Sequence, residues 1–150
     1  LLLMKIIHTI AMSVFSKEEQ TEELEKVFHT FMPIDFQEQK IVFQKTMAQG
    51  VFEDSVTVIT MTLHKERHIR LFVEHLVSHL AQEQKELLIR QFDTRIDEEL
   101  TFYLRIEKEK LLHNEYWITD SGDCFHIKMN LAAYPKKKEK ALEIIKEIFK

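Results

Sequence analysis

Apolar residues recur every three or four positions in four stretches of the chain, the spacing of one face of an α-helix. The first helix follows Ser16, which forms a capping-box pattern with Glu19, and it ends before Pro33. Residues 65–80 and 83–92 predict two more helices, and the last helix starts with Pro135 as its first residue. The positions expected to face the core are Leu24, Val27, Phe28, Phe31, Ile69, Phe72, Val73, Leu76, Val77, Leu80, Leu87, Leu88, Phe92, Ala141, Leu142, Ile145, Ile148 and Phe149.

The other regular stretches alternate apolar and polar residues or are apolar throughout, which is typical of β-strands. Residues 5–15 are mostly apolar on both sides, so we expect this strand inside a sheet. Residues 40–48 and 56–64 predict a hairpin or meander whose loop contains Gly50. Residues 100–107 alternate, and residues 116–119 are expected to pair with residues 124–133 through a turn at Gly122.

This order of elements predicts an α+β fold, a single two-layer domain over residues 1–150 with a mainly antiparallel sheet covered by helices. At 150 residues and 45% hydrophobic content the chain can bury a core without metal or disulfides. The single cysteine, Cys124, fits a reducing compartment, and no apolar run reaches the roughly 18 residues of a membrane span. We therefore expect a cytoplasmic protein without membrane contact, with Met4 as a plausible start after three leucines.

Charge is distributed unevenly along the chain. Residues 124–140 hold five lysines against one glutamate, a local net charge of +4 in a chain whose net charge is −4. Three of these lysines precede or begin the last helix, where the helix dipole favours negative charge by roughly 0.3–1 kcal/mol. The segment therefore indicates an anion site, and the acidity of the rest of the chain confines any nucleic-acid contact to a local surface.

Two segments resemble a known family. They are Arg95-Ile96-Asp97-Glu98-Glu99-Leu100-Thr101-Phe102-Tyr103-Leu104-Arg105-Ile106-Glu107-Lys108 and, ahead of the last amphipathic helix, Tyr134-Pro135-Lys136-Lys137-Lys138. The chain resembles, over nearly its whole length, small archaeal proteins described as RNA-binding or as predicted exosome subunits. It departs from their pattern at residues 15–19 and also near Gln49, where the family has a glycine-rich loop and this chain keeps only Gly50. The resemblance implies a fold similar to that of the ribosomal protein that carries 5S RNA, and a binding function without established chemistry.

Basic and aromatic residues can form one RNA-binding surface if strands 100–107 and 124–133 are neighbours, because alternate residues of both strands then face the same side. The cations would neutralise phosphates, and each stacked base would contribute about 1–3 kcal/mol. The alternative without a binding site is a solvated sheet face with lysines at a helix start. The candidate RNA-binding residues are Tyr103, Arg105, His126, Lys128, Tyr134, Lys136, Lys137, Lys138 and Lys140.

We therefore predict a non-catalytic RNA-binding protein that needs no cofactor, with RNA and exosome subunits as partners. The alternative is a protein-interaction subunit or homodimer without RNA affinity of its own. In that case the apolar edge of the sheet and the histidines of helix 65–80 would make the contacts.

Other candidate chemistry is weaker. His68, His75 and His79 lie near one another on helix 65–80, and His75 and His79 have a spacing that suits one metal ion. They lack an acidic partner on that face and a His-Glu-x-x-His motif, which favours a half-exposed helix border. Cys124 has only His126 as a nearby base, so a small core residue is favoured over a nucleophile. The carboxylates of Asp97, Glu98, Glu99 and Glu107 are interpreted as caps and solvated turns.

Overall fold

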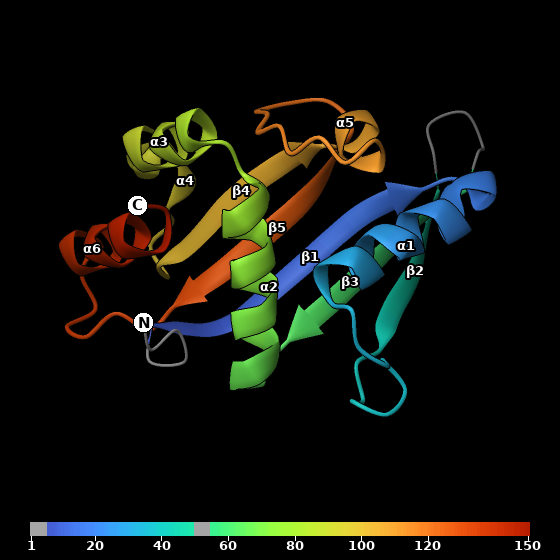
Figure 1. Cartoon of the computed structure of the whole chain (residues 1–150), viewed down its shortest axis with the longest axis horizontal. Helices are drawn as coiled ribbons and strands as arrows, with labels where there is room; N and C mark the ends of the chain where they lie inside the picture. The colour runs from blue at the N-terminus through green and yellow to red at the C-terminus, as the bar shows by residue number, and fades with distance from the viewer. Residues whose placement is uncertain (1–5, 50–54) are drawn as a thin grey trace.

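The computed structural model describes residues 6–49 and 55–150, and the expected loop glycine, Gly50, lies outside these ranges. Its centre is a five-stranded sheet with the strand order β2-β3-β1-β5-β4 (Figure 1). All four neighbouring pairs are antiparallel, and β1 is the middle strand, as its apolar sequence predicted. The strands are β1 (Ile7–Ser16), β2 (Phe43–Gln49), β3 (Ser55–Leu63), β4 (Thr101–Glu107) and β5 (Cys124–Leu131).

Helices α1 and α2 lie across one face of this sheet, while α3, α4 and α6 gather beside β4 and β5 (Figure 1). Within the described ranges, no helix is both long and apolar enough to cross a membrane. The helices are η2 (Glu18–Gln20), α1 (Thr21–Phe31), α2 (Glu66–His79), α3 (Gln82–Arg90), α4 (Phe92–Arg95), α5 (Lys108–Leu112) and α6 (Lys138–Ile148). Together with the antiparallel sheet, they confirm the predicted α+β class.

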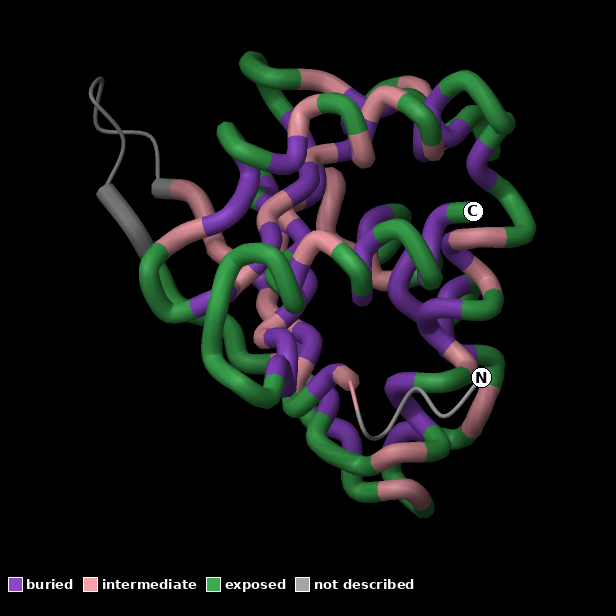
Figure 2. The backbone as a smooth tube through the Cα atoms, turned by 90° about the vertical axis from the view of Figure 1, so that its left-hand side faces the viewer, coloured by how far each residue is buried: buried purple, intermediate pink, exposed green. Residues whose placement is uncertain are grey.

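A single core fills the space between the sheet and the helices, and exposed residues lie mainly on turns and outer helix faces (Figure 2). Burial alternates along β4, where Phe102, Leu104 and Ile106 are buried and the residues between them are half-buried. The alternation shows that one side of β4 faces the core and the other side faces solvent. We call this second side of the sheet the open face. It is formed by residues 9, 11, 13 and 15 of β1, 101, 103 and 105 of β4, and 126, 128 and 130 of β5.

The start of α1 differs from the prediction. Ser16 is not a helix cap, because β1 extends to this residue and pairs it with Thr57. Its buried hydroxyl donates to the carbonyl of Lys17 at 2.8 Å. A short 3-10 turn follows instead, in which the side chain of Gln20 accepts the Lys17 amide at 3.3 Å. Continued strand pairing therefore moved the helix start by several residues.

Two predictions in the last third of the chain are also wrong. Residues 116–119 form one β-bridge between Ile106 and Ile118, not a strand paired with β5. Both edges of β5 are occupied by β1 and β4, so this segment can pair only at the outer edge of β4. The last helix begins at Lys138, because the backbone of Lys137 is extended (φ −136°, ψ 149°) and Pro135 therefore lies before the helix.

Candidate nucleic-acid interface

Four predicted residues form one cluster on the open face. Strands β4 and β5 are neighbours, with Tyr103 opposite Lys128 and Arg105 opposite His126. Opposite residues of an antiparallel pair project to the same side of the sheet. The alternation seen in the sequence therefore does bring two cations, a phenol ring and an imidazole together, and we call these four residues the sheet-face cluster.

The side chain of Tyr103 is held in place by one contact at its hydroxyl and one over its ring. Its hydroxyl donates to Asp97 Oδ2 at 2.7 Å, and the ammonium of Lys128 lies 5.9 Å from the ring centroid. Burial raises the pKa of Asp97, but hydrogen bonds from the Thr101 amide, the Tyr103 hydroxyl and the Glu99 amide outweigh it and lower the pKa overall. The hydrogen bond to Asp97 in turn raises the pKa of Tyr103. A ring fixed in this way loses little freedom when a base stacks on it.

The two cations of the sheet-face cluster have no carboxylate partner in the part of the chain that the structure describes. Among the described residues, neither Arg105 nor Lys128 forms an ion pair. Burial lowers the pKa of His126, and the charges of Arg105 and Lys128 lower it further. The imidazole therefore stays neutral at pH 7, where it can donate or accept a hydrogen bond between two free positive charges.

Cys124 lies beside this cluster as a buried thiol. Its Sγ is 3.5 Å from Nε2 of His126, and its side chain is almost fully enclosed. Burial raises the pKa of Cys124, so the thiol stays protonated near pH 7. This environment matches a small core residue and supplies no activated nucleophile.

We call residues 134–140 the basic turn; its four lysines are exposed, and three of them are paired. Lys136 contacts Glu99 at 3.2 Å, Lys138 contacts Glu98 at 3.7 Å, and Lys140 contacts Glu143 at 3.1 Å. Glu98 and Glu99, which were interpreted as caps and solvated turn residues, therefore offset two lysine charges of this segment, and Glu143 offsets a third. Exposed pairs of this kind contribute only about 0–1 kcal/mol each, so a phosphate could replace the carboxylates.

Only part of the basic turn adjoins the open face. Tyr134 is 73% exposed, and its ring lies edge-on to His8 with a centroid distance of 6.5 Å. Tyr134 and Lys136 share a small hollow with Asn130, which lies at the end of the open face. Tyr134 also lines a second hollow, which it shares with Lys140 and Ile144 of α6 and with Ile6. The predicted nine-residue surface is thus a sheet-face cluster with one adjoining corner at Tyr134 and Lys136, whereas Lys138 and Lys140 pair with Glu98 and Glu143.

Phe15 is a surface residue that the sequence did not reveal. It is 47% exposed and lines a hollow on the open face with Ser13, Val58, His126 and Lys128. The carbonyl of Phe15 accepts a hydrogen bond from Nζ of the buried Lys108 at 2.6 Å. The apolar pattern of residues 5–15 suggested burial on both sides, and only the arrangement of the helices shows which side is uncovered.

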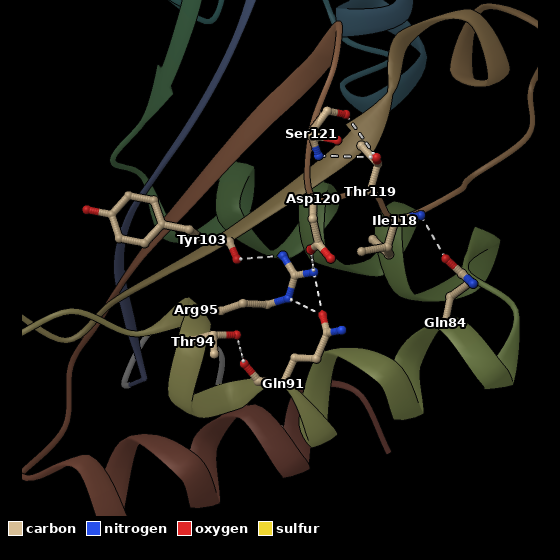
Figure 3. Close-up of polar contacts among 9 residues, drawn as sticks. All are labelled: Gln84, Gln91, Thr94, Arg95, Tyr103, Ile118, Thr119, Asp120 and Ser121. Atoms are coloured by element: carbon tan, nitrogen blue, oxygen red, sulfur yellow. Dashed lines mark hydrogen bonds and ion pairs between the residues drawn. The ribbon is translucent and has the colours of Figure 1, made fainter.

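Arg95 is a second residue that was missed. Its side chain is only 5% exposed and lies at the outer edge of β4 (Figure 3). Nη2 donates to Asp120 at 2.8 Å and to Gln91 at 2.6 Å, and Nη1 donates to the carbonyl of Tyr103 at 3.5 Å. Burial lowers the pKa of Arg95, Asp120 raises it, and the charge of Arg105 lowers it again, with a net lowering. Arg95 thus supplies a donor that a neighbouring strand would otherwise provide.

Segment 117–120 is fixed beside this arginine by backbone hydrogen bonds to β4, among them one from the Glu107 amide to the Trp117 carbonyl at 2.9 Å, and by a side chain of α3. The amide of Thr119 donates to the carbonyl of Arg105 at 2.9 Å. The buried side chain of Gln84 on α3 accepts the amide of Ile118 at 2.7 Å (Figure 3). Because a buried amide without an acceptor would cost about 1–3 kcal/mol, Gln84 anchors the segment that carries Asp120.

The three histidines of α2 do not meet at one point. Nε2 of the buried His68 lies 3.3 Å from Oε1 of Gln39, whereas His75 and His79 stack on each other with centroids 4.0 Å apart. In the part of the chain that the structure describes, no group of three or more histidine, cysteine, aspartate or glutamate side chains could hold a metal ion. His75 instead contacts the hydroxyl of Tyr116 at 2.6 Å.

Comparisons with known proteins identify the family and the relatives of this chain. A family model described as RNA binding matches residues 9–131. The chain is 26% identical over 141 residues to a protein named RNA-binding protein PAB1135 from Pyrococcus abyssi, covering 93% of this chain and 92% of that protein. The crystal structure of protein AF2318 from Archaeglobus fulgidus, family DUF54, superposes with a TM-score of 0.80 at 26% identity over 95% of this chain and 99% of that one. Mth689, a DUF54 protein from Methanothermobacter thermautotrophicus, gives a TM-score of 0.76 at 25% identity over 97% and 99% of the two chains.

Proposed function

Because this chain belongs to the family whose model is described as RNA binding, we propose that it binds single-stranded RNA on the open face of its sheet. The observation that carries this proposal is the sheet-face cluster, in which Arg105 and Lys128 flank a fixed ring without any carboxylate partner among the described residues. Cations in this position neutralise phosphates and release counterions. The binding is non-catalytic, and Tyr134 and Lys136 extend the surface at the Asn130 corner.

Single strands fit this surface better than duplexes. The rings of Tyr103 and Phe15 can stack only on bases that are already unpaired and unstacked. The two rings project from different strands of the open face, with Lys128 next to both. In this arrangement one base stacks on each ring, and the phosphates of the strand lie near Lys128 and Arg105.

Replacing Arg105 and Lys128 together by glutamine should weaken the binding of a mixed-sequence single-stranded RNA about 10- to 100-fold. The reason is the loss of two phosphate contacts, which also makes the slope of log affinity against log salt shallower by about 1.4. Filter binding or fluorescence anisotropy across a salt series measures both quantities.

The matched control is the double variant Lys26→Gln and Arg70→Gln, which removes two exposed cations from α1 and α2 in the covering layer. A triple variant of Lys136, Lys137 and Lys138 to glutamine tests the basic turn separately, and we expect a smaller effect because two of these lysines are already paired. Equal affinities for the sheet-face double variant and its control would overturn the assignment of the site.

An RNA-processing role beside exosome subunits extends the proposal and rests on the family resemblance alone. Co-purification of exosome subunits with the tagged protein from an archaeal host, lost after nuclease treatment, would indicate an RNA-bridged association. Retention after nuclease treatment would indicate a direct protein contact.

A homodimer is the second candidate function, and one observation favours it. Strand β2 is an edge of the described sheet, and Val42 and Met47 on or next to it are 71% and 69% exposed. An edge strand with exposed apolar side chains can pair with the same strand of a second copy. If this is the function, sedimentation velocity should show a dimer that becomes a monomer in the Met47→Lys variant, with no RNA affinity in either form. A monomer at all concentrations excludes it.

A further inference from the structure

A groove lies beside the outer edge of β4, on the opposite side of this strand from β5. It has a volume of about 740 Å³ and is bounded by α3, α4, β4 and segment 117–120. Figure 3 shows the guanidinium of Arg95 inside this region, with Asp120 above it and the ring of Tyr103 pointing away. The groove is continuous with the sheet-face cluster because Tyr103 and Arg105 border both. Its lining residues are Arg90, Gln91, Thr94, Arg95, Tyr103, Arg105 and Asp120.

Positive charge dominates this lining. Three arginines face one carboxylate, and only Arg95 is paired with that carboxylate. Within the described ranges, Arg90 and Arg105 have no ion-pair partner. Bringing guanidinium groups together in a partly enclosed space costs free energy unless an anion joins them.

The donors in the groove are arranged for an oxyanion. Arg95 uses four of its five N–H groups on Gln91, Asp120 and the Tyr103 carbonyl, which leaves one N–H on Nη1. Arg95 is therefore held rigidly and contributes a fixed charge, whereas Arg90 and Arg105 retain free donors. Guanidinium groups with free N–H pairs bind phosphate oxygens in a bidentate manner.

We propose that this groove is a phosphate subsite for the RNA strand that crosses the open face. The inference rests on the proposed RNA binding. The strand leaves the sheet-face cluster at Tyr103 and bends over the edge of β4. Arg90 and Arg105 contact one of its phosphates there, while Arg95 acts as a positioning residue. The exposed carboxylate of Asp120 competes with the phosphate for the same cations.

The competition predicts opposite effects for two substitutions in one groove. Arg90→Gln should weaken binding of single-stranded RNA about 5- to 10-fold and make the salt slope shallower by about 0.7, because one phosphate contact is lost. Asp120→Asn should strengthen binding about 3-fold or more, because the competing charge is gone. The matched controls are Arg70→Gln and Glu74→Gln on α2, which change charge equally on a distant covering helix and should alter affinity less than about 2-fold.

Three outcomes are distinguishable. Opposite shifts for Arg90→Gln and Asp120→Asn beyond those of their controls support the subsite. If the unmodified protein binds RNA but both groove variants match their controls, the subsite is wrong and RNA binding on the open face still holds. No RNA binding at low salt overturns both proposals. Thermal melting of each variant checks the fold, and Arg90→Gln keeps the test decisive if Asp120→Asn unfolds, because Arg90 is exposed and makes no ion pair within the described ranges.

Discussion

Replacing Phe102 by alanine is expected to lower the free energy of unfolding by about 3–5 kcal/mol. Phe102 is fully buried on β4. The centroid of its ring lies 6.2 Å from the ring centroid of Phe92 and 6.3 Å from that of Phe149. Removing it deletes apolar contacts and leaves a cavity that α4 and α6 cannot close without moving. Urea unfolding followed by circular dichroism measures the loss.

The control is Phe15→Ala, which removes the same group from the open face. Because Phe15 is 47% exposed, its replacement should cost less than about 1 kcal/mol of stability. The same variant should bind single-stranded RNA more weakly by about 1–3 kcal/mol if a base stacks on this ring. Similar stability losses at both positions would show that Phe15 belongs to the core and not to the binding surface.

The contrast between these two phenylalanines shows what the sequence could predict. Strict alternation along residues 100–107 placed Tyr103 and Arg105 on one side of the strand and Phe102 on the other, and in the structure the side with Phe102 is buried. The register of β4 against β5 then confirmed that Lys128 and His126 join them. Alternation is a local property, so it can be recognised in the sequence wherever only one side of a strand is buried.

Phe15 and Arg95 could not be predicted in this way. The central strand β1 carries apolar residues on both sides, and its open side is identified only by where α1 and α2 lie. Arg95 is buried because a carbonyl at the edge of β4 needs a donor, a requirement that arises only once the sheet has formed. Likewise, the pairs of Lys136 and Lys138 with Glu99 and Glu98 join residues far apart in the chain.

The histidines of α2 illustrate the same limit and lead to a second large effect. Spacing indicated a half-exposed border, and His75 is half-buried while His79 is exposed. Spacing did not reveal that the His75 ring packs against Phe31 of α1, with ring centroids 4.6 Å apart, and against Tyr116. Burial, together with the charge of the neighbouring His79, lowers the pKa of His75 to about 4. Burial also raises the pKa of Tyr116 to about 12, so its hydroxyl keeps its proton and can donate to a neutral imidazole.

The protein should therefore lose stability in mild acid. Above pH 6.5, His75 is neutral in the folded and unfolded states, and its contribution is fully present. As the pH falls from 6.5 to about 4, the unfolded chain binds a proton that the folded protein does not, so the free energy of unfolding decreases. Allowing for partial solvent contact, we expect a loss of about 2 kcal/mol from this residue between pH 7.5 and 4.5.

Urea unfolding at several pH values tests this expectation with the His75→Gln variant, whose amide can still bond to Tyr116 but does not titrate. Burial lowers the pKa values of His68 and His126 as well, so both proteins should weaken in acid, but the variant should lose about 2 kcal/mol less. His64→Gln, at an exposed position after β3, should follow the unmodified protein. Parallel pH profiles for all three proteins would mean that His75 takes up its proton in the folded state without opening the contact between α1, α2 and Tyr116.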